Sequence, residues 1–169
     1  LWYQQQQKEE SLQKVRVTQA TGEAIRHIYE LVDKGLFEEA LALVQQNQNR
    51  LNKGRFSSLH EQLQQVRQDV ELAYRLDEIR LGKASGLGSM DSKKTDKQYQ
   101  EAFDLLDILG EESAEQVAQR IGRSAIRKQL IVALDDWADV AQGRERVERL
   151  LQIARYADPD PWRDRFRDV

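Results

Sequence analysis

The chain has 169 residues, with 26 basic and 29 acidic side chains that give a formal net charge of -3. These charges are spread evenly, so neither half is the basic tail typical of nucleic-acid binding or an acidic counterpart. Cysteine is absent, which excludes disulfides, thiolate metal sites and cysteine nucleophiles. Only 9 Gly and 2 Pro interrupt a sequence rich in unbranched side chains that favour helices. The sequence therefore predicts an all-α fold of about eight amphipathic helices.

A long first helix is predicted over residues 4–34. Ala24, Ile25 and Ile28 belong to an apolar stripe, whereas the earlier Gln-rich part has almost none and is expected to be a solvated extension. Trp2 and Tyr3 are followed by four glutamines. Such a step from aromatic to polar residues is typical of the point where a membrane helix enters water, and a frayed helix start is the alternative interpretation. The longest aliphatic run, 130–134, is far shorter than the roughly 20 residues of a span. Membrane attachment is expected only through a helix preceding residue 1.

A helical hairpin is predicted where the first helix ends. Gly35 permits the turn, Phe37 packs inside the hairpin, and the small Ala40 lets a second helix, which runs towards Leu51, approach closely. These residues resemble the middle of a tetratricopeptide repeat (TPR). No second copy follows at a period of 34, so a lone hairpin and a divergent repeat both remain open.

The main domain boundary is expected after a third helix. That helix opens near Ser57 or Ser58 and carries a heptad-like seam that ends at Asp77. Glycine and serine are then dense in residues 82–89, which is typical of a flexible connection. The sequence therefore predicts two helical sub-bundles, residues 1–84 and 96–169, joined by a linker over 85–95.

Four further helices and a short last one are predicted beyond the linker. Gly110 ends the fourth, Ser113 with Gln116 resembles a capping box for the fifth, and Ser124 caps the sixth. The sixth carries the most regular apolar stripe of the chain and ends at Gly143, after which a seventh follows. Asp160 is expected to cap the last helix and Pro161 to occupy its first position. We expect this last helix to be solvated, except for Trp162 and Phe166.

The candidate site residues of the carboxy-terminal half have structural roles in this interpretation. We expect Trp137 to pack against Trp162, and Arg127 to pair with a carboxylate such as that of Asp135 or Asp136. Adjacent aspartates diverge by roughly 100° on a helix, so they cannot act as a catalytic pair, and we expect Asp135 and Asp136 to be surface aspartates. His27 and His60 lie on different predicted helices. No enzyme activity, cofactor or metal site is therefore expected.

Residues 113–130 also allow a helix-turn-helix interpretation, with Gly122 at the turn and Ser124 opening a recognition helix. The side chains that would then contact phosphate are Arg120, Arg123, Arg127 and Lys128. The recognition helix, however, continues into the apolar stripe and into Asp135 and Asp136, which would repel DNA. DNA binding is therefore kept only as an alternative.

Several strings resemble a region of large bacterial transmembrane serine/threonine kinases that carry tetratricopeptide repeats. The strings cover 76–81, 99–103, 124–127, 133–138 and 157–164, in matching order and spacing. In that family a cytoplasmic kinase domain is followed by a membrane helix, a helical region like this one and a repeat array. The resemblance implies a non-catalytic interaction, sensor or spacer module on the extracytoplasmic side, with an unidentified protein or peptide partner. A soluble TPR-like peptide-binding scaffold is a further alternative.

Overall fold

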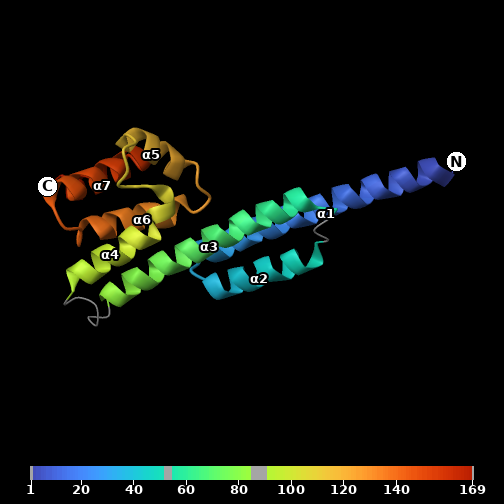
Figure 1. Ribbon diagram of the computed structural model, residues 1–169, viewed down its shortest axis with the longest axis horizontal. Helices are drawn as coiled ribbons and strands as arrows, with labels where there is room; N and C mark the ends of the chain where they lie inside the picture. The colour runs from blue at the N-terminus through green and yellow to red at the C-terminus, as the bar shows by residue number, and fades with distance from the viewer. Residues whose placement is uncertain (1, 52–54, 85–90, 169) are drawn as a thin grey trace. The chain divides into compact units, whose positions relative to one another are not determined.

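The computed structural model describes residues 2–51, 55–84 and 91–168, and this part of the chain is helical without any strand (Figure 1). The predicted all-α class is confirmed. The chain divides into two compact units, residues 1–71 and 72–169, and the division falls inside the third helix. The helices are α1 (Trp2–Asp33), α2 (Phe37–Arg50), α3 (Ser57–Ala84), α4 (Ser92–Ala102), the 3-10 helix η1 (Asp104–Leu106), α5 (Ala114–Gly122), α6 (Arg127–Ala138), α7 (Arg144–Ala157) and α8 (Pro161–Arg167).

Unit 1 is built on a hairpin of α1 and α2. Gly35 adopts the left-handed conformation at φ 74°, which glycine reaches at little cost, and so reverses the chain between the two helices. Phe37 and Ala40 are buried, as the sequence predicted. The hairpin is therefore present, but an array of TPR-like hairpins is not confirmed.

The amino-terminal part of α3 completes the core of unit 1. Its buried stripe includes Leu59, Leu63 and Val66, at the predicted spacing. Leu59 and Leu63 form a cluster with Leu51, against which Val17, Ile25 and Phe56 pack. This cluster joins side chains of α1, α3 and the segments that flank the connection between α2 and α3.

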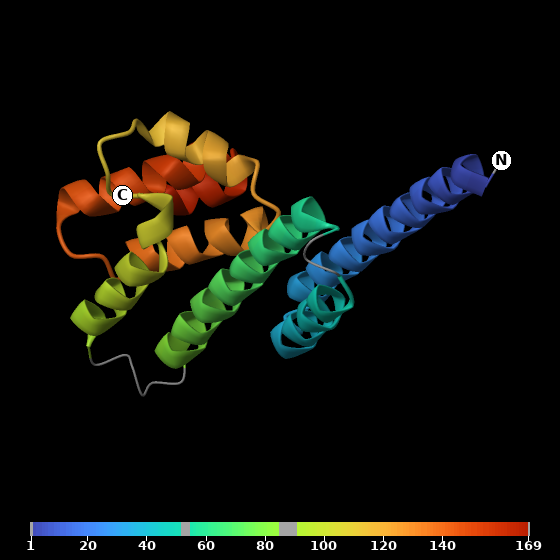
Figure 2. The same cartoon turned by 45° about the vertical axis from the view of Figure 1, so that its right-hand side comes forward.

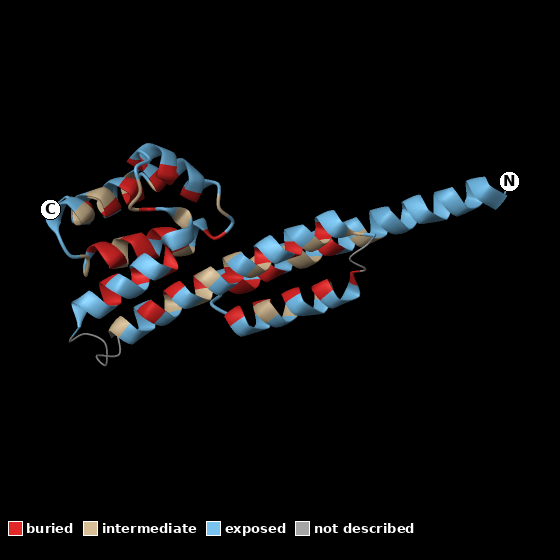
Figure 3. Cartoon of the chain, in the orientation of Figure 1, coloured by how far each residue is buried: buried red, intermediate tan, exposed pale blue. Residues whose placement is uncertain are grey.

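The first half of α1 contributes nothing to that core. Every residue from 2 to 16 is exposed, and the first buried residue of the helix is Thr21 (Figure 3). The exposed side chains include Trp2, Tyr3, Leu12 and Val15. The predicted solvated extension is therefore confirmed.

Unit 2 is a bundle in which α7 packs against α5 on one side and against α6 on the other (Figure 2). Its largest fully buried side chains include Tyr99, Phe103, Ile121 and Trp137. The apolar stripe of α6 predicted from the sequence is buried almost throughout.

The expected linker over 85–95 is partly replaced by helix. Residues 85–90 lie outside the described part of the chain, whereas α4 begins at Ser92. Asp91 caps α4, because its side chain accepts the backbone N–H of Lys94 at 3.0 Å. The polar first turn of α4 looks like linker in the sequence because its apolar face begins only near Tyr99.

The predicted starts of α5, α7 and α8 are confirmed. Ser113 and Gln116 form a reciprocal capping box, and Asp160 caps α8 with Pro161 as its first residue. Gly143 precedes α7 at φ 94°.

Three predicted helix ends were wrong. The helix expected to end at Gly143 stops at Ala138. Ser124 accepts the backbone N–H of Ile126 at 3.3 Å in a local turn, so α6 starts only at Arg127. The helix expected to reach Gly110 stops at Ala102, and η1 follows it.

Candidate functional site

The most buried carboxylate of unit 2 is that of Asp96, on α4, which is 5% exposed. Its Oδ1 accepts the indole N–H of Trp137 at 2.7 Å. Its Oδ2 accepts Arg146 Nη1 at 2.8 Å and the backbone N–H of Gln142 at 3.3 Å. One carboxylate thus joins α4, α6, α7 and the segment between α6 and α7. All three donors to Asp96 belong to other segments of unit 2. The cluster of Asp96 with Trp137, Gln142 and Arg146 is therefore suited to holding helices together.

Trp137 packs against Tyr99 and Phe103 rather than against Trp162. Its ring stacks on Phe103 with centroids 5.3 Å apart and on Tyr99 at 6.2 Å. Trp162 is 67% exposed and makes an edge contact with Phe166 at 5.0 Å. The expected tryptophan pair was therefore wrong. The stripe of α6 points inwards, whereas the aromatic side chains of α8 point outwards.

Arg167 is the buried residue of α8, with an exposed fraction of 3%. Its Nε and Nη2 groups each donate to one oxygen of Asp135 at 2.8 Å, and Nη1 donates to Asp164 at 3.0 Å. The hydrogen bond to Asp135 raises the pKa of the Arg167 guanidinium, against the opposite effect of burial. The expectation that Trp162 and Phe166 form the inner face of α8 was wrong, because a bidentate carboxylate makes the guanidinium the better group to bury.

Arg127 binds the end of α7 and not the aspartates of its own helix. It donates to the carbonyl oxygen of Ala157 at 3.0 Å and to Asp158 at 3.4 Å. Asp135 lies eight positions further along α6, about 12 Å at 1.5 Å per residue, which is too far for the predicted pair. A cation at the carboxy-terminal end of a helix also satisfies carbonyl groups that have no partner within that helix.

Asp136 is half-buried, and burial raises the pKa of its carboxyl group above the ordinary value, while the nearby Lys83 acts in the opposite direction. Within the described chain no donor reaches its Oδ2 atom. Lys83 Nζ donates instead to the backbone oxygen of Asp136 at 3.4 Å and to the side chain of Asp139 at 3.2 Å. Asp136 is therefore not the simple surface aspartate expected from the sequence.

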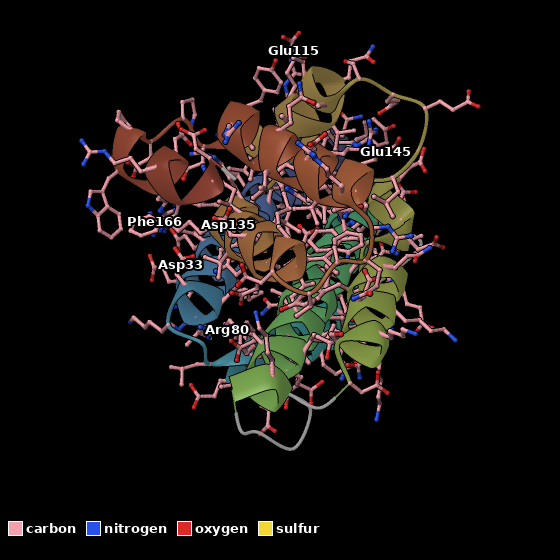
Figure 4. The ribbon with its side chains drawn as sticks, turned by 90° about the vertical axis from the view of Figure 1, so that its left-hand side faces the viewer. Asp33, Arg80, Glu115, Asp135, Glu145 and Phe166 are labelled. Carbon is pink, nitrogen blue, oxygen red and sulfur yellow. The ribbon has the colours of Figure 1, made fainter. Side chains whose placement is uncertain are left out.

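A cleft of about 380 Å³ lies among α6, α7 and α8, and we call it the α6–α8 cleft. Figure 4 shows two of its residues, Asp135 and Phe166, on the same side of unit 2. The residues that line it are Val132, Asp135, Asp136, Asp139, Leu151, Arg163, Phe166 and Arg167. It combines carboxylates, apolar side chains and an exposed aromatic ring.

Polar contacts also fasten α3 within unit 1. Tyr29 of α1 donates its hydroxyl to Asp69 at 2.7 Å, and burial together with this bond raises the pKa of the tyrosine. Arg67 donates to the side-chain oxygens of Gln45 at 2.8 Å and Gln48 at 3.2 Å. These bonds tie α3 to both helices of the hairpin.

The helix-turn-helix segment uses two of its basic side chains inside unit 2. Arg120 donates to the carbonyl oxygen of Leu106 at 2.7 Å and lies 2.8 Å from Glu112, and Arg127 binds the end of α7. In addition, α5 packs mainly against α7 rather than α6. These contacts remove side chains on which DNA binding would depend.

His27 and His60 do not come together in a metal site. His27 is exposed, with its Nδ1 atom 3.4 Å from Glu30 on the same helix. Among the described residues, no group of three or more His, Asp or Glu is arranged to hold a metal ion. None of the helices in the same part of the chain is sufficiently long and apolar to cross a bilayer.

Sequence reasoning missed the residues on which these clusters depend, above all Asp96, Arg149 and Arg167. Arg149 donates to three backbone carbonyl oxygens, those of Ile108 at 2.8 Å, Gly110 at 2.9 Å and Glu112 at 2.8 Å. Asp96 was detectable, because its spacing from Tyr99 and Phe103 puts all three on one helical face. Arg167 was hidden in the alternating charges of residues 163–168.

The chain matches no protein-family model, no curated protein and no solved structure.

Proposed function

We propose that the chain is a helical interaction and spacer module of a larger, membrane-anchored bacterial signalling protein. The observation that carries this proposal is the first half of α1, where residues 2–16 form helix without a buried side chain. Its role is to bind or position a protein or peptide partner rather than to transform a substrate.

A helix of this kind needs support from outside the described core. Helices in water depend mostly on packing of an apolar face, because nucleation is unfavourable and propensity alone is weak. Trp2, Tyr3, Leu12 and Val15 are exposed by between 49% and 77%, so their apolar surface is open to a partner. Partner binding would stabilise this half of α1.

The charged clusters of unit 2 support a non-catalytic role. Asp96 is held by Trp137 and Arg146, and Asp135 is held by Arg167. Each of these side chains joins different helices, which accounts for its burial without any reaction. The carboxylates are therefore assigned to positioning helices.

The sequence resemblance to the region between the membrane helix and the repeat array of large bacterial kinases supports the signalling context. The resemblance implies a position on the extracytoplasmic side, adjacent to a membrane helix. A spacer in that position would transmit or measure the separation between a membrane and a bound partner.

Affinity capture tests the proposal with a variant in which Trp2, Tyr3, Leu12 and Val15 are all replaced by Gln. Glutamine keeps helix propensity and removes apolar surface. A matched control carries Leu105→Gln and Tyr156→Gln, which alter exposed side chains of unit 2. We expect the original chain and the control to retain a common protein from source-cell extract and the α1 variant to lose it. Equal retention by all three, or turnover of a substrate by the purified chain, would overturn the proposal.

A further inference from the structure

The α6–α8 cleft has walls with an excess of acidic side chains. Three aspartates and two arginines line it, so the walls carry a formal charge of -1. Both guanidinium groups are already bound by carboxylates. Arg167 is held by Asp135 and Asp164, and Arg163 donates to Asp158 at 2.7 Å.

The carboxylates of the cleft that these arginines leave uncompensated belong to Asp136 and Asp139. The side chain of Asp139 is 70% exposed, so it can accept further donors. Lys83 shows that this edge of α6 accepts an ammonium group, since its Nζ atom lies 3.2 Å from Asp139 Oδ2. Electrostatic complementarity in the cleft therefore favours a cation over an anion.

Aromatic rings next to these carboxylates favour the same kind of ligand. Phe166 lines the cleft and is 71% exposed, and it is in edge contact with Trp162, which is 67% exposed. The face of an aromatic ring attracts a cation within about 6 Å of its centroid. Val132 and Leu151 add apolar surface for an aliphatic side-chain stem.

We propose that the α6–α8 cleft binds an arginine or lysine side chain from a basic, amphipathic segment of a partner protein. Asp139 and Asp136 receive the cationic group, while Phe166, Val132 and Leu151 contact its stem and the neighbouring apolar residue of the segment. This inference rests on the proposed interaction function and names the chemistry of the partner. A second, independent surface on α1 is not required for it.

Nuclear magnetic resonance titration of the full chain tests the cleft, with the indole N–H of Trp162 as the reporter. The probes are short synthetic amphipathic peptides of Leu with Arg, Leu with Glu, and Leu with Gln. We expect the Leu–Arg peptide alone to shift the Trp162 resonance, with an affinity that falls as salt is added. Asp139→Asn and Phe166→Ala should each weaken binding by about threefold, in line with the usual size of exposed ionic and cation–π contacts.

Lys83→Ala distinguishes cation binding in the cleft from a purely structural role of the cleft residues. Removal of the chain's own ammonium group frees Asp139, so the Leu–Arg peptide should bind more tightly. Leu105→Ala, at a 91% exposed side chain of η1, is the control and should leave the affinity unchanged.

Three outcomes would overturn the inference. They are no shift of Trp162 by the Leu–Arg peptide, equal binding by the Leu–Glu peptide, or binding that Asp139→Asn and Phe166→Ala leave intact. If such an outcome accompanies capture that still depends on α1, the interaction function stands and only this cleft loses its role. If α1-dependent capture is also absent, the proposed function fails separately.

Discussion

Trp137 combines aromatic stacking with a buried hydrogen bond. It is fully buried, it stacks on Phe103, and it donates its indole N–H to the buried Asp96. Truncation would leave a large cavity and would also leave a buried carboxylate with fewer donors. The packing of α4 against α6 therefore depends strongly on this residue.

We expect Trp137→Ala to lower the free energy of unfolding of unit 2 by about 3 to 5 kcal/mol, measured by urea denaturation. Trp162→Ala is the matched control, and because Trp162 is exposed it should change stability by less than about 0.5 kcal/mol. Equal losses for the two variants would show that the assignment of the buried tryptophan is wrong.

Asp136 predicts a pH-dependent effect. Burial raises the pKa of its carboxyl group above the ordinary 3.8, so the folded protein binds this proton more tightly than the unfolded chain does. The contribution of this group to stability is therefore largest below the ordinary pKa and falls as pH rises through the raised value.

Asp136→Asn removes that dependence, so the melting temperature should rise at pH 7, and the gain should shrink as pH is lowered towards 3.8. Glu111→Gln, at an exposed carboxylate, is the control and should show little change at either pH. A gain that is absent at neutral pH, or one that grows on acidification, would contradict the assigned burial.

Single-residue partners were the least predictable part of the sequence. Trp137 was correctly placed on the buried stripe of α6, because helical periodicity defines a face. Its partners were not, since stacking on Phe103 and bonding to Asp96 depend on how α4 packs across α6. For the same reason, Arg127 binds the end of α7, and Arg167, which was expected to be solvated, is buried against Asp135.

The helix ends of unit 2 were more predictable, because capping is local. Ser113 accepts the backbone N–H of Gln116 at 3.2 Å, and the Gln116 side chain accepts that of Ser113 at 3.1 Å. Spacing in the sequence is sufficient to predict this pair. The start of α4 was missed because its capping Asp91 follows a glycine- and serine-rich stretch that resembles a linker.

Ser113→Ala should lower the stability of unit 2 by about 1 kcal/mol, because it removes one of the two reciprocal bonds at the start of α5. Urea denaturation measures this loss. Gln119→Ala, at an exposed position of the same helix, should cost nothing and can add slightly to helix propensity. If both substitutions have the same effect, the cap does not stabilise α5.

At the scale of the whole molecule, the sequence predicted the all-α class, and it placed a domain boundary at residues 85–95. The all-α class follows from composition and helical periodicity over long segments. The two units divide between Glu71 and Leu72, inside α3, because residues of one continuous helix serve two cores. A linker signal in the sequence cannot reveal a division of that kind.

The most distinctive whole-molecule feature is the contrast between the two halves of α1. Residues 2–16 are exposed, whereas Thr21, Ile28, Leu31 and Val32 are buried. The interaction function requires the first half to take no part in the fold of the free chain. The backbone hydrogen bonds of the first half should then open at a low free-energy cost. Those of the second half should open only when unit 1 unfolds.

Hydrogen exchange measured by mass spectrometry on the free chain tests this claim most directly. We expect fast exchange for residues 2–16 and strong protection for residues 24–33 at low protein concentration. Added partner, or a second copy at high concentration, should slow exchange in residues 2–16 alone. Strong protection of residues 2–16 in the dilute, isolated chain would mean that they pack within the fold, and it would contradict their assignment as a surface for a partner.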